Sequence, residues 1–560
     1  MDIFHLDKVS FTYPDAKEKA LSNINLHIKK GEFTVIAGPS GCGKTSLLRL
    51  LKRELAPVGD QEGTIYYNGQ PLEKFDERTL IEEIGFVFQN PDNQIVMDEV
   101  MQEIVFGMEN LGYSTLEMRK RVAELVHFFG LDNLLYEKPS KLSGGQKQMV
   151  NLLSVLLLKP KVLLLDEPTS QLDPVAAREL LSMLTRLNEE MGITIILVEH
   201  RLEQLYERAD RIILMNHAQI SYAGRSEDLI QEVYERGDDS FIPYIPSITR
   251  LFLERQGPSP VKKLPLTVKD SRSWISSLPE IPHDEEVSQA ESPLSRDVIL
   301  QAKNIFFQYD RKGKLILNNF SLTVKEGDFF ALVGGNGSGK TTALKICLGI
   351  VNQQRGSLRI FGKKLTKKES PALYKDIAYL PQNPQSYFSY DSIEEEMKAV
   401  MKQHGLSDGE VKITEMLHAF GIEHLRHRHP YDCSGGEMQK AALAAMLLKN
   451  PKLLIVDEPT KGFDNVSKKE FASLLEGLHE KGLTIVMVTH DIEFAAKYAS
   501  RCAMLFEGEI TALGTPDELF RGNYFYTTAI NRATRDQRLP EALTLEEALL
   551  KWPSEVQELI

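Results

Sequence analysis

The sequence predicts an α/β protein in which one phosphate-binding core occurs twice. The segment Gly38-Pro39-Ser40-Gly41-Cys42-Gly43-Lys44-Thr45 fits the G-x-x-x-x-G-K-[ST] loop, and so does Gly334-Gly335-Asn336-Gly337-Ser338-Gly339-Lys340-Thr341. The first loop lies between a strand-like apolar run, residues 33–37, and a helical run, residues 45–51. Strand, glycine loop and helix in this order are the context that confirms such a loop.

A series of further motifs follows each loop in nearly constant register. The matched pairs are Lys44 and Lys340, Gln89 and Gln382, Ser143 and Ser434, Asp166 and Asp457, and His200 and His490, with offsets between 290 and 296 residues. The alternative for one such loop is a chance glycine-rich turn. That alternative does not explain five motifs repeated in the same order, so the chain is predicted to be a fused internal pair.

Domain organisation follows from this repeat. A chain of 560 residues has room for about four compact units. We expect a first nucleotide-binding domain at residues 1–235, an appendage with a proline-rich linker at 236–297, a second nucleotide-binding domain at 298–520 and a C-terminal appendage at 521–560. In each domain, a helical subdomain should accompany the phosphate-binding core.

The first helical subdomain is predicted to begin near Asp98. Val100, Ile104, Met108 and Leu111 recur there at the spacing of one helix face.

The region between the copies is interrupted by proline. Residues 243–293 hold 8 of the 26 prolines, which interrupt regular structure. Leu264 to Val268 with Trp274 resembles Leu539 to Leu545 with Trp552, and these are the chain's two tryptophans. We therefore expect a small appendage on each copy, the alternative being a coincidence of short matches, and a flexible connector at 276–297.

Composition excludes several classes of protein. Hydrophobic content of 42% and charged content of 26% are ordinary for a globular protein, and the net charge is −13. An acidic chain argues against nucleic acid or anionic lipid as the main partner. The four cysteines form no C-x-x-C pair, so neither disulfides nor zinc are predicted. No signal peptide or apolar run of ~18 residues is present, so work at a membrane would need another subunit.

The glycine loops predict binding of ATP with Mg²⁺. Glycines let backbone N–H groups cradle phosphates, and the helix that follows adds a favourable dipole. Lys44 and Lys340 would neutralise the β- and γ-phosphates, while Thr45 and Thr341 would place a hydroxyl on Mg²⁺.

Two apolar strands, residues 162–165 and 453–456, each end in Asp-Glu. Asp166 and Asp457 can meet the Mg²⁺ shell, and Glu167 and Glu458 can act as general bases on the attacking water. A solvated turn is the alternative for one such pair, and the twin occurrence argues against it.

Histidine and glutamine complete each predicted site. His200 and His490 each follow an apolar strand, which favours a role in sensing the γ-phosphate over a structural one. Gln89 and Gln382, at matching register, are predicted to be Mg²⁺ or water ligands that couple the site to other elements.

Two aromatic residues precede the loops. Tyr13 and Tyr309 can stack on adenine, with packing in the core as the alternative.

A Ser-Gly-Gly segment opens a predicted helix in each copy, formed by Ser143, Gly144 and Gly145 and by Ser434, Gly435 and Gly436. The N–H groups, dipole and serine hydroxyl of such a helix start make an anion site. Its natural use is to cover the γ-phosphate held by the other copy.

With this signature, both halves resemble ATP-binding cassette (ABC) proteins over about 440 residues. In that family, two cassettes sandwich two ATP molecules head to tail. The resemblance implies one site built on Lys44 and closed by Ser434 to Gly436, and another built on Lys340 and closed by Ser143 to Gly145.

A finer resemblance is to the ATPases of energy-coupling-factor importers, which take up vitamins and cobalt or nickel ions. It rests on Gln89 to Gln94 and Phe106 to Gly112, with a looser match at Gln382 to Gln385. It implies peripheral attachment at the cytoplasmic face of the cell membrane, through an integral membrane scaffold subunit and a small membrane substrate-binding subunit.

Departures from the family pattern suggest unequal sites. Cys433 and Glu437 replace the usual Leu and Gln of the signature, and the usual Arg is Met149 in one copy and Lys440 in the other. We hypothesise that the Lys44 site turns over more slowly. The alternative functions are a soluble tandem-cassette ATPase acting on the ribosome or nucleic acid, and a sugar or peptide importer ATPase.

Overall fold

The computed structural model describes residues 1–14, 16–258, 263–279, 296–310, 313–365, 373–407, 409–537 and 539–552. These residues divide into two compact units. The first unit holds residues 1–246, 258–266 and 464–466, and the second holds 247–257, 267–463 and 467–560. Most of the predicted connector, 276–297, lies outside the described residues.

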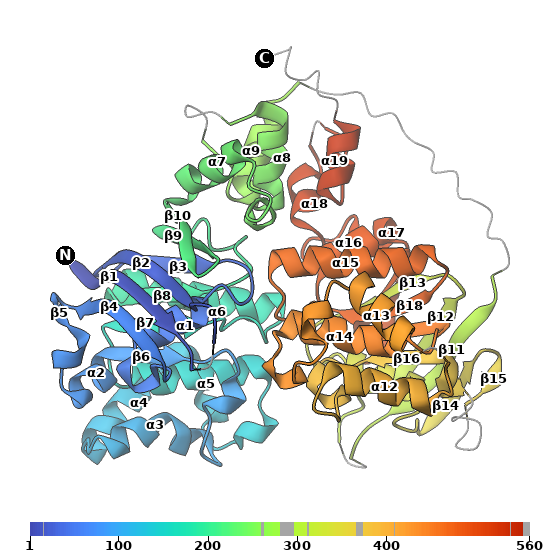
Figure 1. The fold of residues 1–560 in the computed structure, drawn as a ribbon, viewed down its shortest axis with the longest axis horizontal. Helices are drawn as coiled ribbons and strands as arrows, with labels where there is room; N and C mark the ends of the chain where they lie inside the picture. The colour runs from blue at the N-terminus through green and yellow to red at the C-terminus, as the bar shows by residue number, and fades with distance from the viewer. Residues whose placement is uncertain are drawn as a thin grey trace. The chain divides into compact units, whose positions relative to one another are not determined.

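The first copy is built on two sheets (Figure 1). The smaller has the order β2-β1-β4-β5, and the larger β10-β9-β3-β8-β7-β6, in which β10 alone runs antiparallel to its neighbour. The strands are β1 (Asp2–Thr12), β2 (Leu21–Lys29), β3 (Phe33–Ala37), β4 (Asp60–Tyr67), β5 (Gln70–Pro71), β6 (Ile84–Val87), β7 (Val162–Asp166), β8 (Thr194–Val198), β9 (Arg211–Asn216) and β10 (Gln219–Gly224).

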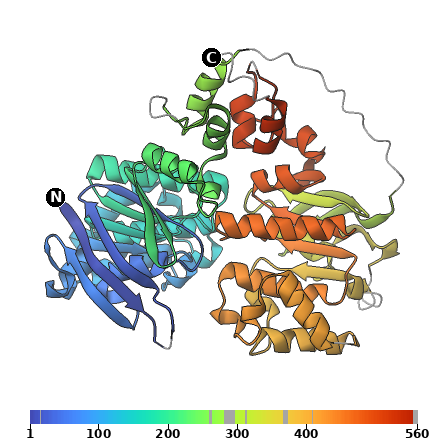
Figure 2. The same cartoon turned by 45° about the horizontal axis from the view of Figure 1, so that its top comes forward.

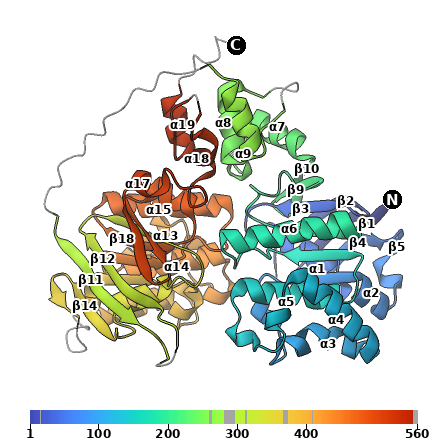
Figure 3. The same ribbon diagram turned by 180° about the vertical axis from the view of Figure 1, so that it is seen from behind.

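Every residue of β3, β7 and β8 is buried, as continuously apolar strands with both faces covered should be. The helices of this region are α1 (Lys44–Leu50), α2 (Glu77–Glu83), α3 (Val100–Asn110), α4 (Thr115–Phe129), α5 (Gly144–Leu156), α6 (Pro174–Met191) and α7 (Ser226–Arg236). The predicted helix near residue 100 is confirmed as α3, which buries Val100, Ile104 and Met108. Figure 3 shows α3, α4 and α5 grouped as a helical subdomain.

The second copy repeats this plan, with sheets in the orders β12-β11-β14-β15 and β16-β17-β18-β13-β19-β20. Its strands are β11 (Val298–Phe307), β12 (Leu317–Lys325), β13 (Phe329–Val333), β14 (Arg355–Ile360), β15 (Lys363–Lys364), β16 (Ile377–Leu380), β17 (Leu453–Asp457), β18 (Thr484–Thr489), β19 (Arg501–Phe506) and β20 (Glu509–Gly514). Its helices are α10 (Lys340–Cys347), α12 (Ile393–Gln403), α13 (Gly409–Ala419), α14 (Gly435–Leu447), α15 (Asn465–Glu480), α16 (Ile492–Tyr498) and α17 (Pro516–Phe520).

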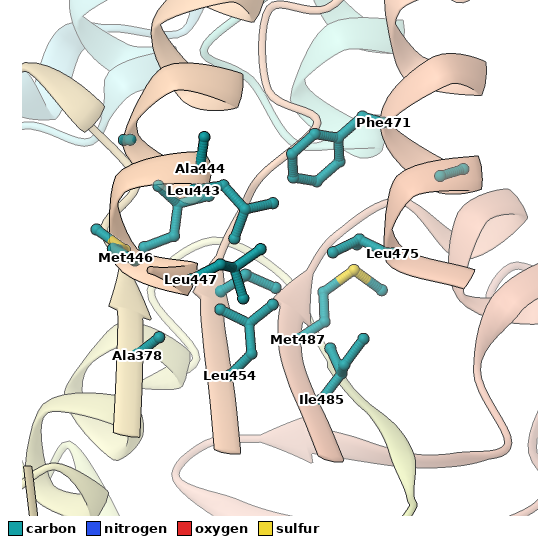
Figure 4. Packing of buried hydrophobic residues seen from close by; sticks show 14 of the residues in the cluster. Ala378, Leu443, Ala444, Met446, Leu447, Leu454, Phe471, Leu475, Ile485 and Met487 are labelled. Atoms are coloured by element: carbon teal, nitrogen blue, oxygen red, sulfur yellow. The ribbon is translucent and has the colours of Figure 1, made fainter. Parts of the chain in front are cut away.

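Helices α12, α13 and α14 form the second helical subdomain, in gold and orange in Figure 2. The core beneath it joins helix to sheet (Figure 4). Leu443 and Leu447 of α14 and Leu475 of α15 pack with Leu454 of β17 and Met487 of β18, all fully or almost fully buried. Burying such side chains stabilises the fold by roughly 1.5–3 kcal/mol each, so this layer holds α14 and α15 against β17 and β18.

Four short helices of the second unit form a separate hydrophobic cluster, which we call the appendage cluster (Figure 1). They are α8 (Ser247–Gln256), α9 (Val268–Ser276), α18 (Ala529–Thr534) and α19 (Leu545–Lys551). Thr267 and Thr544 cap α9 and α19 in the same way, as the sequence repeat between them suggests. The tryptophan rings of Trp274 and Trp552 lie 6.3 Å apart in this cluster. Among the described residues, no helix is long and apolar enough to cross a membrane.

Candidate nucleotide site

Each glycine-rich loop joins a buried strand to a helix that begins at its lysine. In the first copy the loop follows β3, and Gly43 precedes α1 with a φ of 101°. A Cβ atom on Gly43 would lie 2.3 Å from the carbonyl oxygen of Ala20, so both backbone angle and space require glycine here. Gly339 has the same role before α10, with a φ of 103°.

Both lysines are folded back against their own loops. Lys44 is 5% exposed, and its Nζ donates to the carbonyl oxygens of Gly38 and Pro39, each at 2.8 Å. Lys340 donates to Gly334 and Gly335 at 2.9 and 3.0 Å. An ammonium group held against two carbonyl oxygens of its own loop is a fixed positive charge for phosphate oxygens.

The threonine after each lysine contacts the aspartate at the end of the neighbouring apolar strand. Thr45 Oγ1 donates to Asp166 Oδ1 at 3.0 Å, and Thr341 Oγ1 donates to Asp457 Oδ1 at 3.2 Å. Burial, with a smaller contribution from the adjacent glutamate, raises the pKa of Asp166 to about 6, and burial likewise raises the pKa of Asp457 to about 6. A hydroxyl and a carboxylate so placed are ligands of the kind that Mg²⁺ prefers, so the residues fit that ion.

The glutamate after each aspartate has an unusual backbone. Glu167 and Glu458 have φ values of 43° and 48°, a region that residues other than glycine seldom adopt. Each N–H donates to the end of the next strand, Glu167 to Val198 and Glu458 to Val488. Backbone strain of this kind is concentrated at functional sites, where the surrounding structure holds it.

The two glutamates have different side-chain partners. Glu167 Oε2 accepts from Gln89 Nε2 at 2.5 Å, and its Oε1 lies 2.7 Å from His200 Nε2. Glu458 Oε2 lies 2.7 Å from His490 Nδ1, and its Oε1 lies 3.5 Å from Lys340 Nζ. Burial alone would raise the pKa of Glu458, but His490 and Lys340 outweigh it and lower that pKa. Among the described residues, Gln382 makes no hydrogen bond to Glu458.

The structure therefore brings together, within each copy, the lysine, threonine, aspartate, glutamate and histidine named from the sequence. Gln89 joins its group, and Gln382 does not. Tyr13 and Tyr309 are 37% and 60% exposed, so neither is a core residue; their hydroxyls contact Ser46 and Thr342 of the following helix.

These geometries agree with comparisons to known proteins. Residues 21–170 and 317–461 match the family model described as ABC transporter. The chain belongs to the ABC transporter family. It is 44% identical over 98% of both chains to a Bacillus cereus protein provisionally described as an ABC transporter ATP-binding protein. A Methanosarcina acetivorans protein with the same description is 33% identical over 92% of this chain and 86% of its own.

A solved structure of cbiO1 from Clostridium perfringens, described as part of the ABC transporter complex cbiONQ, is 28% identical and covers 40% of this chain and 90% of its own, with a TM-score of 0.37. The family model and the relatives show that the protein is an ATP-hydrolysing ABC ATPase with two tandem cassettes.

Each Ser-Gly-Gly segment opens a helix, as predicted, and its serine is the N-cap residue. Ser143 Oγ accepts from Gln146 N at 3.3 Å, and Ser143 N donates to Gln146 Oε1 at 2.9 Å, which closes a capping box at the start of α5. Ser434 and Glu437 form the same box at the start of α14. In that second box, His424 Nε2 lies 3.4 Å from Glu437 Oε1.

One residue near the first site was not identified from the sequence. Glu199, the residue before His200, is 2% exposed and bonds to the turn that follows Glu167. A polar residue at the end of an apolar strand gives no signal of this by itself. The signal available was the mismatch between copies, because Thr489 occupies the same register before His490.

Proposed function

We propose that this ABC ATPase energises a membrane importer of the energy-coupling-factor type, which takes up a vitamin or a transition-metal ion. The observation that carries the proposal is the presence of a complete lysine, threonine, aspartate, glutamate and histidine set in both cassettes. Fused sugar-type ATPases often carry one degraded site, so two intact sets favour the energy-coupling-factor class over a sugar importer.

The segment after β6 supports this assignment. Gln89 to Gln94, which resembles the glutamine loop of that class, forms a turn in which Asn90 caps Pro91–Asn93. Asp92 is paired with Lys147 of α5 at 2.5 Å, and α3 follows with the Phe106-Gly107 pair. A structured turn attached to the signature helix is suited to transmit a change at Gln89 to a docked partner.

We assign roles by chemistry. Lys44 and Lys340 bind the β- and γ-phosphates of ATP, and Tyr13 and Tyr309 stack on adenine. Mg²⁺, when bound, polarises the γ-phosphate; Thr45, Gln89 and Asp166 would hold it in one cassette, and Thr341, Gln382 and Asp457 in the other. Glu167 and Glu458 act as general bases on water, and His200 and His490 sense the γ-phosphate.

Each site is proposed to be composite. The helix starts at Ser143 and Ser434 place backbone N–H groups at a positive dipole end, which suits a γ-phosphate. We infer that Ser434, Gly435 and Gly436 close the Lys44 site and that Ser143, Gly144 and Gly145 close the Lys340 site. ATP binding would join the two cassettes and hydrolysis would release them, driving the partner between two states.

The proposed partners are an integral membrane scaffold and a small membrane substrate-binding subunit, with this chain attached at the cytoplasmic face. The test is purification of the tagged chain from detergent-solubilised membranes of its own cells, with identification of the co-purifying proteins. We expect a scaffold and a small, very hydrophobic protein. Recovery with ribosomes alone would favour a soluble tandem-cassette factor, and recovery with two large permease subunits a sugar or peptide importer.

A further inference from the structure

Glu199 is a buried carboxylate beside the first catalytic group. It follows β8 and is 2% exposed. Its Oε1 accepts from the N and Oγ1 of Thr169, at 2.9 and 2.6 Å, and its Oε2 accepts from the backbone N of His200 at 3.2 Å. Burial, with a contribution from the charge of Glu167, raises the pKa of Glu199. A buried carboxylate is unfavourable unless such donors compensate it, so its presence here needs a reason.

The second cassette has a different residue, with different hydrogen bonds, at the position of Glu199. Thr489 replaces Glu199, and its Oγ1 accepts from Asp491 N at 2.9 Å, the N-cap residue of α16. The backbone N of His490 then donates to Glu458 itself, at 3.2 Å from Oε2. The corresponding N–H donor of His200 is taken by Glu199 instead.

The backbone N–H of the histidine therefore has a different acceptor in each cassette, and this changes the surroundings of the catalytic glutamate. Glu458 Oε2 has two donors from one residue, His490 N and Nδ1, which hold it at the end of β18. Glu167 lacks the backbone donor and instead accepts from Gln89 across the site at 2.5 Å.

The two histidine rings also face their glutamates with different nitrogen atoms. His200 approaches its glutamate with Nε2, whereas His490 does so with Nδ1. His200 is 5% exposed, and its Nδ1 has no hydrogen-bond partner within the part of the chain that the structure describes.

We propose that Glu199 is a positioning residue of the first ATP site, which withholds the His200 N–H donor from Glu167 and so directs Glu167 to Gln89. The hydrogen bonds of Glu199 to Thr169 hold the Asp-Glu-Pro-Thr turn against the end of β8. They also hold the Glu199 carboxylate where it accepts from His200 N. Glu199 touches neither nucleotide nor water in this scheme. The inference rests on the proposed role of Glu167 as general base.

A double-mutant cycle between Glu199 and Gln89 tests it. Gln89 bonds to Glu167, whereas Glu199 bonds to Thr169 and His200, and within the described residues the two make no hydrogen bond to each other. Hydrolysis is measured in the full chain carrying Glu458→Gln, so that the first site is observed. In this background we expect Gln89→Ala to lower kcat on the order of tenfold, with KM within about twofold. After Glu199→Thr, the same Gln89→Ala change should lower kcat by a smaller factor, on the order of threefold, because Gln89 keeps its proposed place on Mg²⁺ but no longer holds Glu167. If the two substitutions instead lower kcat by independent factors that multiply, the inference is overturned.

Two controls separate positioning from general damage. Glu103 is also a buried carboxylate of the first cassette, accepting from the backbone N of Val96 and Met97 at 2.9 and 2.8 Å. Glu103→Gln should lower the unfolding temperature without changing the Gln89→Ala effect. Glu199→Gln keeps one acceptor oxygen and should restore part of the coupling that Glu199→Thr removes.

A structural readout is independent of activity. A crystal structure of the Glu199→Thr chain should show His200 N donating to Glu167, as His490 N does to Glu458. An unchanged Glu167–Gln89 bond would overturn the inference and leave the proposed function intact. If Glu167→Gln left first-site hydrolysis unchanged, the proposed role of Glu167 itself would fail.

Discussion

The hydroxyl of Thr45, at the start of α1, donates a hydrogen bond of 3.0 Å to Asp166 Oδ1, at the end of β7. The bond holds a carboxylate whose pKa burial raises to about 6, and the second cassette repeats it with Thr341 and Asp457. A carboxylate of this kind is kept for a ligand rather than for stability, because its charged form is disfavoured in the empty site.

We expect Asp166→Asn to stabilise the nucleotide-free protein. The folded-state pKa of about 6 exceeds the ordinary value of 3.8, so the folded state binds the extra proton and stability falls as pH rises from about 4 to about 6. Above pH 6 the replacement should therefore be favourable by up to roughly 3 kcal/mol, and below pH 4 it should make no difference. Thermal unfolding at pH 7.5 and pH 4.5 without nucleotide checks this, and a gain that is larger at the lower pH would contradict it.

The same change should remove the Mg²⁺ dependence of nucleotide binding at the first site. Fluorescent ATP analogue titrations with and without Mg²⁺, in the Asp166→Asn and Asp457→Asn chains, measure it. We expect each single variant to retain one Mg²⁺-dependent site, and the double variant none.

Much of this architecture could be predicted from the sequence because it depends on local chemistry. A glycine before each lysine, an apolar strand before each Asp-Glu and a serine before each signature helix are all local signals, and each was found at the expected element. The partners of Glu167 and Glu458 could not be predicted, because they depend on which donors the fold brings near each carboxylate in three dimensions. The grouping of α8 and α9 with α18 and α19 was likewise hidden, since it depends on contacts between distant segments.

The two ATP sites should turn over at different rates. The Lys44 site is proposed to be closed by Ser434, whose helix carries Glu437 in its first turn. Burial raises the pKa of Glu437, but hydrogen bonds with Ser434 outweigh this and lower it, so the carboxylate is charged at neutral pH. We expect Glu458→Gln to remove more of the total hydrolysis than Glu167→Gln. Equal losses in the two variants would contradict unequal sites.

Reversing the charge difference between the two signature helices should reverse the difference in hydrolysis rate between the two sites. Glu437→Gln removes a negative charge from a helix start that would face a phosphate, and Gln146→Glu adds one at the matching position of α5. We expect the first change to raise hydrolysis at the Lys44 site on the order of threefold and the second to lower it at the Lys340 site by a similar factor. Each is measured with the other site inactivated, and opposite or absent changes would exclude this origin of the asymmetry.

Within the first loop, Gly43 should be much less replaceable than Gly41. Gly43→Ala requires a left-handed backbone and would bring Cβ to 2.3 Å from Ala20, whereas Gly41→Ala has a similar φ of 79° but open space around it. We expect Gly43→Ala to lower the free energy of unfolding by about 1–3 kcal/mol more than Gly41→Ala does. Denaturant unfolding of the nucleotide-free chain measures the difference, and equal values would show that the close approach is relieved elsewhere.

Tryptophan fluorescence should report on the appendage cluster alone, because the chain's two tryptophans both lie there. Trp552 is 1% exposed, and its Nε1 donates to the carbonyl oxygen of Pro540 at 3.0 Å. We expect Trp552→Ala to destabilise this cluster by about 3–5 kcal/mol, so that emission from Trp274 shifts to the red at a lower temperature than in the unmodified chain. Leu550, on the same helix, is 86% exposed, and Leu550→Ala is the matched control that should change nothing. Circular dichroism on the same samples follows the cassettes, so a parallel shift of both signals would mean that the cluster unfolds together with the second cassette rather than by itself.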